Sequence, residues 1–244
     1  MTWRMDTTAR NILSDLDKGG WSIICDFDGT IARIDVTDAI LDRFADPAWE
    51  DVEKEWLNGT ITARRCMESQ VRLIKAAPAD IDAFLKTVPI TRGFAEFIRF
   101  CAESNLSILV VSDGIDHAVK RVLAGNGYGN IPVIANRLRF QEESGYRLDF
   151  PYSSEGCKSG VCKCDVSKAV GGKILLIGDG RSDICLASVA SFVLAKRGKP
   201  LHLHCEENAI PHAVYNDFFD VLNYLASACK QSEGCNADGL GVAL

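Results

Sequence analysis

Residues 21–30 have the sequence WSIICDFDGT, in which a short apolar run stops abruptly at two aspartates and a glycine. Two later runs share this design: ILVV at 108–111 precedes Ser112-Asp113-Gly114, and ILLI at 174–177 precedes Gly178-Asp179-Gly180. Continuous apolar runs of this length, separated by helical patterns, are typical of strands buried on both faces of a parallel sheet. Because ligands bind beyond the carboxyl ends of such strands, the three polar clusters predict a site there.

The rest of the sequence predicts further helices and strands, and together with the three apolar runs they indicate an α/β protein. Apolar residues recur at helical spacing in 94–101, 115–123 and 218–225, and FVLA at 192–195 predicts a further strand. Residues 133–150 predict a β-hairpin with Gly145 in its turn.

Residues 36–88 are too long for a simple crossover and carry several helical patterns, so they predict a helical cap inserted between the first two strands. We expect its hinges near 31–36 and 88–92. The predicted boundaries are 1–35 and 89–230 for the core, 36–88 for the cap, and 231–244 for a flexible tail.

Composition narrows the possible functions. With 244 residues, of which 47% are hydrophobic, the chain can bury a substantial core. A net charge of −6 argues against nucleic acid as a partner, because phosphate backbones are held by clustered Lys and Arg. No apolar run approaches the ~18 residues of a membrane helix. The first 20 residues lack the apolar stretch of a secretory signal, so we expect a cytoplasmic protein without a membrane partner.

The ten cysteines are scattered, several of them in apolar runs, and we expect most to be reduced. Cys157, Cys162 and Cys164 leave open a structural zinc site. Their spacing is not that of a standard zinc knuckle, and His202, His204 or Cys205 would have to supply a fourth ligand from afar.

Asp26 and Asp28 lie two residues apart after the first strand, where Gly29 permits a tight turn. One carboxylate can attack phosphorus to form an aspartyl phosphate, and the other can protonate the leaving oxygen and then deprotonate a water. The alternative is an acidic loop without catalytic function.

Three motifs carry a family resemblance. DFDGT at 26–30, SDG at 112–114 and GDGRSD at 178–183 resemble the first, second and fourth motifs of the haloacid dehalogenase superfamily, in the same order. The resemblance covers most of residues 20–200 and implies a Rossmann-like parallel sheet with an inserted helical cap. It also implies a phosphatase in which Asp26 is the nucleophile and Asp28 the general acid and base.

The resemblance also implies how phosphate and metal bind. Ser112, Asp113 and Gly114 would hold the phosphoryl oxygens, although this turn could instead cap the following helix. Mg²⁺ prefers hard oxygen ligands, and the family holds it with Asp26, the main-chain carbonyl of Asp28, and Asp179. Asp183 would hold the metal ligands in place by hydrogen bonding, or would contact the metal through a water. A purely structural acidic cap at 179–183 is the alternative.

The family also requires a lysine to neutralise phosphate and nucleophile. Lys163 is our choice because it begins the helix before the fourth-motif strand, with Lys158 as the alternative. Lys168 and Lys173 fit solvated positions better.

We expect the cap to bind the substrate and to determine which substrate is accepted. In the phosphoserine-phosphatase-like branch an acid nine residues after the nucleophile binds substrate, and Asp35 has this offset from Asp26. Arg64 is a second candidate, although charges on a helix are often only a solvated face.

Within that branch the chain most resembles the methionine-salvage phosphatases, which act on 2-hydroxy-3-keto-5-methylthiopentenyl-1-phosphate. The resemblance lies in IICDFDGTI, the hairpin region up to GCKSGVCK, and FVLAK. Asp113 is the more general superfamily form of the second motif. The alternatives are a phosphoserine- or phosphocholine-type phosphatase, a phosphotransferase, or a non-catalytic phospho-ligand or zinc-binding module.

Overall fold

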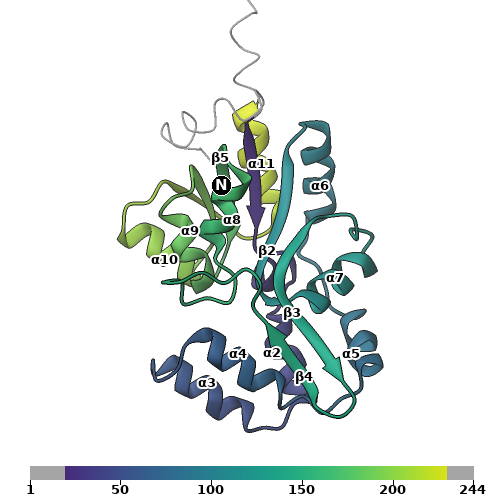
Figure 1. The fold of residues 1–244 in the computed structure, drawn as a ribbon. Coiled ribbons are helices and arrows are strands. Elements are labelled where there is room, and N and C mark those ends of the chain that lie inside the picture. Colours follow the sequence, from purple (N-terminus) through teal and green to yellow (C-terminus); the bar gives the residue numbers. More distant parts are fainter. Residues whose placement is uncertain (1–19, 230–244) are drawn as a thin grey trace, which may run out of the picture. The chain divides into compact units, whose positions relative to one another are not determined.

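The computed structural model describes residues 20–229 (Figure 1). These residues form two compact units. The first unit contains residues 20–24, 91–108 and 171–229, and the second contains 25–90 and 109–170. The predicted tail at 231–244 and the first 19 residues of the predicted core lie outside the described residues. Among the helices of residues 20–229, none has the length and apolar character needed to cross a bilayer.

Three strands of the first unit, β1, β5 and β6, lie where the apolar runs predicted them. Strand β1 neighbours β5, and β5, β6 and β7 follow as parallel neighbours. Its elements are β1 (Trp21–Cys25), α6 (Phe94–Glu103), β5 (Lys173–Gly178), η3 (Arg181–Asp183), α9 (Ile184–Ala187), β6 (Phe192–Lys196), α10 (Pro200–Glu207), β7 (His212–Tyr215) and α11 (Phe218–Cys229).

Helices α6 and α11 pack through an aromatic cluster. The ring of Phe218 lies 5.0 Å from that of Phe94 and 4.9 Å from that of Phe97, measured between centroids. All three rings are buried. Edge and tilted contacts of this kind add to the stabilisation that burial of the rings provides.

The second unit contains most of β2, which pairs with β3 in parallel, and β3 pairs with β4 as an antiparallel hairpin. Its elements are η2 (Phe27–Ile31), α2 (Val36–Phe44), α3 (Trp49–Leu57), α4 (Ala63–Val71), α5 (Pro78–Leu85), β2 (Ser107–Ile115), α7 (Asp116–Gly125), β3 (Val133–Gln141), β4 (Gly145–Asp149) and α8 (Lys163–Val170).

Strand β2 is longer than predicted. It continues through residues 112–114 to Ile115, and its register with β3 shifts between Val111 and Ile115. Such an irregularity bends a strand and re-aims its side chains. The polar second motif therefore occupies the bulged end of a strand and not the loop behind it.

Residues 36–88 hold the four helices α2 to α5. Helix α4 contacts β4, and the Tyr146 hydroxyl of β4 donates to the carbonyl of Ala76 at 3.0 Å. The two ends of this segment run side by side: Ala32 and Ile90 form an antiparallel bridge, and Arg33 N donates to Pro89 O at 3.1 Å.

Strand β7 and helix α10 were not predicted from the sequence. Strand β7 has only four residues, too few for a clear alternation. Helix α10 begins with Pro200 and buries Leu201, His202 and Cys205, so a histidine on its inner face obscures the apolar periodicity.

Candidate active site

The Asp26 loop leaves β1 in an extended conformation and turns at once. Asp26 has φ −71° and ψ 162°, while Gly29 has φ +70°, in the left-handed region that favours glycine. Gly29 N donates to the carbonyl of Ile34 at 3.1 Å, which closes the turn. The loop thus sets Asp26 and Asp28 directly after the strand, as the sequence predicted.

Lys163 forms a buried ion pair with Asp26. Its Nζ lies 2.7 Å from Asp26 Oδ1, and the two side chains are 0% and 6% exposed. The lysine is the first residue of α8, which places its ammonium group at the start of that helix. A charge-assisted hydrogen bond away from water is strong, so it holds the two side chains together.

The three other candidate lysines lie elsewhere. Lys158 is exposed, and Lys168 pairs with Asp165 on the solvent side of α8. The Lys173 ammonium lies 5.4 Å from the ring centroid of Trp21. Of the four lysines, Lys163 is the one that the structure joins to Asp26.

Asp28, Ser112 and Gly114 form a second cluster. Asp28 Oδ1 accepts a hydrogen bond from Val36 N at 2.8 Å, and Ser112 Oγ lies 3.2 Å from Asp28 Oδ2. Gly114 N donates to Ser112 Oγ at 2.9 Å. A methyl group at Gly114 would stand 2.5 Å from Asp28 Oδ2, so only glycine fits. The alternative that this turn caps the next helix finds no support, since α7 has no side-chain cap.

Asp113 faces a different way from its neighbours. Its Oδ1 accepts a hydrogen bond from Val161 N at 2.8 Å, in the segment before Lys163. Burial raises the pKa of this carboxyl, against the opposing effects of the Val161 N–H and the Lys163 charge. The carboxylate therefore connects the second motif to the segment that carries the lysine.

Asn136 of β3 was missed from the sequence. Its side chain is fully buried, and Nδ2 donates to the carbonyl of Asp113 at 2.5 Å. A single asparagine at the start of a predicted strand gives no signal that could have found it.

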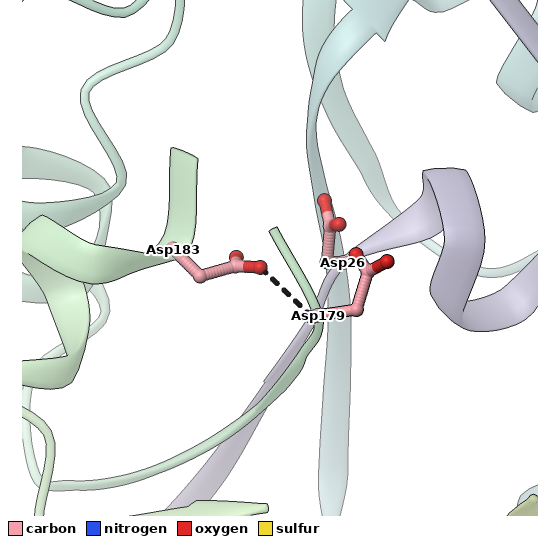
Figure 2. A group of neighbouring side chains, drawn as sticks. All are labelled: Asp26, Asp179 and Asp183. Carbon is pink, nitrogen blue, oxygen red and sulfur yellow. Dashed lines mark hydrogen bonds between the residues drawn. The ribbon is translucent and has the colours of Figure 1, made fainter. Parts of the chain in front are cut away.

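Asp179 and Asp183 belong to the turn after β5. Both are buried, and Asp183 Oδ2 accepts hydrogen bonds from Asp179 N at 3.1 Å and Gly180 N at 3.0 Å. Figure 2 shows the Asp183 carboxylate directed at the backbone of Asp179. Asp183 also lies against Gly178, where no Cβ would fit. It therefore fixes the turn that presents the Asp179 side chain.

The predicted substrate-binding residues of the helical segment have structural partners. Asp35 caps α2 by accepting a hydrogen bond from Asp38 N at 3.0 Å. Arg64 Nη2 donates to the carbonyl of Cys157 at 3.2 Å. Arg64 thus reaches from α4 to the segment that leads to Lys163.

The cysteines do not form a metal site in the part of the chain that the structure describes. Cys157, Cys162 and Cys164 do not gather with a fourth ligand there. The eight cysteines between residues 20 and 228 form no disulfide bonds.

Comparison with known proteins decides the family. The haloacid dehalogenase-like hydrolase family model matches residues 23–188. The chain belongs to the haloacid dehalogenase-like hydrolases. The resemblance drawn from its three motifs is thereby confirmed, as is the expected fold.

Two relatives of this hydrolase carry the name 2-hydroxy-3-keto-5-methylthiopentenyl-1-phosphate phosphatase. One, from Geobacillus thermodenitrificans, is 32% identical over 211 residues, covering 83% of this chain and 94% of the relative. Another, from Brevibacillus brevis, is 30% identical with the same coverage. A substrate-bound phosphoserine phosphatase structure shares the fold, with a TM-score of 0.62 at 22% identity over 83% of this chain and 97% of that chain. This haloacid dehalogenase-like hydrolase is a phosphatase, which confirms the expected enzyme class.

Proposed function

We propose that this phosphatase hydrolyses 2-hydroxy-3-keto-5-methylthiopentenyl-1-phosphate in the cytoplasm, with Mg²⁺ and through an aspartyl phosphate. The names of the relatives support this substrate, because their alignments cover nearly the whole of each relative. The observation that carries the mechanism is the buried pair of Asp26 and Lys163.

Asp26 is the proposed nucleophile. One of its carboxylate oxygens forms a bond to phosphorus while the bond from phosphorus to the ester oxygen breaks. Lys163 holds the carboxylate by its Oδ1 at 2.7 Å, which fixes the direction of attack. Its positive charge also reduces the repulsion between this carboxylate and the phosphate, two anions that must approach each other.

Asp28 is the proposed acid and base. Val36 N and Ser112 Oγ hold its two oxygens, so the carboxyl group has a fixed orientation. It gives its proton to the leaving alkoxide and later takes one from the water that hydrolyses the aspartyl phosphate. Ser112 and Gly114 are the proposed donors to the phosphoryl oxygens.

The acidic residues fit the predicted metal. Asp26, Asp179 and Asp183 are all buried, and each could offer a carboxylate oxygen to a cation. We assign Mg²⁺ to Asp26, the Asp28 carbonyl and Asp179, with Asp183 holding the Asp179 turn through two backbone N–H groups. When bound, Mg²⁺ neutralises charge on the transferred phosphoryl group.

We assign to residues 36–88 the binding of the part of the substrate beyond its phosphate group. Helix α3 buries none of its residues fully, so Trp49 and Trp56 keep apolar surface that a methylthio group could contact. Met67 of α4 is also half-buried, and Asp35 and Arg64 are the polar candidates. A mainly apolar lining with a few polar groups is typical of a small-molecule pocket.

The test compares kcat/KM for the methylthio intermediate, phosphoserine, phosphocholine and a phosphopeptide. We expect the methylthio intermediate to be the best substrate, and Asp26→Asn, which folds but lacks a nucleophile, to turn over none of the four. Preference for phosphoserine would reject the assigned substrate, preference for the phosphopeptide would reject a closed small-molecule pocket, and full activity in Asp26→Asn would reject the aspartyl phosphate.

A further inference from the structure

The two ends of the Asn136 amide have different surroundings. The residue is fully buried in β3, and Nδ2 donates to the carbonyl of Asp113 at 2.5 Å. Its Oδ1 is buried without any hydrogen-bond partner. Leaving an acceptor unpaired inside a protein costs stability, and an apolar side chain would avoid that cost. The part of Asn136 that the fold uses is therefore its amide donor.

This donor controls the direction of a peptide group. The carbonyl of Asp113 and the N–H of Gly114 belong to the same planar, trans peptide, so they point in opposite directions. Asn136 holds the oxygen, and the N–H on the other side donates to Ser112 Oγ at 2.9 Å. Rotation of this peptide would break both hydrogen bonds together.

The same peptide is connected to the lysine. The Asp113 carboxylate accepts a hydrogen bond from Val161 N at 2.8 Å, two residues before Lys163. Between these segments, Gly160 lies against Asn136 so closely that a Cβ there would stand 2.6 Å from both Nδ2 and Oδ1. The amide is thus packed closely against the backbone of Gly160.

We propose that Asn136 is a positioning residue that sets the Asp113–Gly114 peptide in the orientation from which Ser112 and Gly114 bind the phosphoryl group. The inference rests on the proposed function, which assigns phosphate binding to these two residues. Asn136 acts through other residues, since its Oδ1 is buried and its Nδ2 contacts the Asp113 carbonyl and, at 3.9 Å, Met67 Sδ.

The first test is Asn136→Asp, which keeps the shape of the side chain and replaces the donor by an oxygen that repels the Asp113 carbonyl. Misplacing the donors should lower kcat/KM for p-nitrophenyl phosphate about 10- to 100-fold. The inhibition constant of inorganic phosphate, a probe for the phosphate-binding donors alone, should rise about tenfold. The control is Asn126→Asp, the same chemical change at an exposed asparagine in the same unit, which should leave both constants unchanged.

Gly160→Ala provides a second variant, because its methyl group would stand 2.6 Å from the Asn136 amide and 2.8 Å from Phe150 Cδ1, so it displaces the amide without removing it. We expect the same pair of changes, with thermal unfolding showing that the protein is folded at the assay temperature. If Asn136→Asp does not fold, Gly160→Ala decides alone.

Folded variants that stay within about twofold of wild type in both constants would overturn the proposal. A loss of turnover with unchanged phosphate inhibition would overturn it too. If only the proposed substrate is wrong, the outcome is different. The wild-type enzyme would then not hydrolyse the methylthio intermediate, while the variants would still change kcat/KM for p-nitrophenyl phosphate and the inhibition constant of inorganic phosphate.

Discussion

The buried pair of Lys163 and Asp26 predicts strong energetic coupling between the two residues. Because the side chains are 0% and 6% exposed, Lys163→Met leaves the Asp26 carboxylate buried without this counter-charge. Removing one partner of a buried pair costs about 3–5 kcal/mol. For a chain of this size that corresponds to a fall in Tm of roughly 6–20 °C. Asp26→Asn should have a cost of the same order, since it leaves the ammonium group buried.

The double variant should recover most of the loss. With both charges gone, neither is left buried without its counter-charge, and replacing a buried ion pair by neutral groups is often close to neutral, so we expect about 0–3 kcal/mol of destabilisation. The sum of the single changes would be about 6–10 kcal/mol, so the predicted coupling is several kcal/mol. Urea unfolding and thermal melts, both in EDTA to exclude metal, measure all four proteins.

Lys168→Met is the matched control because this lysine lies on the same helix, α8, but is 74% exposed beside Asp165. It should change stability by less than about 0.5 kcal/mol. If the double variant instead showed the full sum of the single losses, Lys163 and Asp26 would be acting independently and the role of the pair would be refuted.

Three further predictions concern the site and the helical segment. Gly114→Ala should lower kcat/KM about 100-fold, since the methyl group would meet Asp28 Oδ2 at 2.5 Å; Gly125→Ala, with open space around it, is the control, and equal activity of the two variants would contradict the steric argument. Activity should vanish in EDTA and return with Mg²⁺, with Asp179→Ala requiring far more of it; recovery with zinc alone would contradict the metal assignment. Desolvation and the charges of nearby acids, Asp35 first, raise the pKa of Asp38 from 3.8 to about 7. The stability that the folded protein gains while Asp38 is protonated is therefore fully present below pH about 4 and is lost as the pH rises through about 7. Asp38→Asn should make the Tm depend less on pH in that range. An unchanged slope would argue against the raised pKa of Asp38.

The sequence predicted those parts of the fold that have a local pattern. Strands β1, β5 and β6 lie where the apolar runs are, because burial on both faces favours a continuous apolar run over an alternating one. The short strand β7 and the bulged end of β2 depend on pairing with neighbours, which no local pattern records.

The residues of the candidate site also differ in whether a local sequence pattern could predict them. Asp26 and Asp28 could be predicted because they directly follow a strand. The family resemblance implied a lysine, and its predicted position at the start of a helix favoured Lys163 over Lys158. A five-residue separation places one ammonium group at Asp26 and leaves the other side chain exposed. Asn136 could not be predicted at all, since its partner lies 23 positions away in the chain.

The bridge between Ala32 and Ile90 has a consequence for how this enzyme could change over evolution. The chain leaves for the helical segment and returns from it at one place, where Arg33 N also bonds to Pro89 O. Whatever lies between these positions is anchored at neighbouring points, as an inserted domain is. A segment of different length or shape could therefore replace residues 34–88 without altering the spacing of its attachment points. With the substrate-binding role proposed for this segment, new substrate preferences could then arise by exchange of a whole module as well as by point substitution.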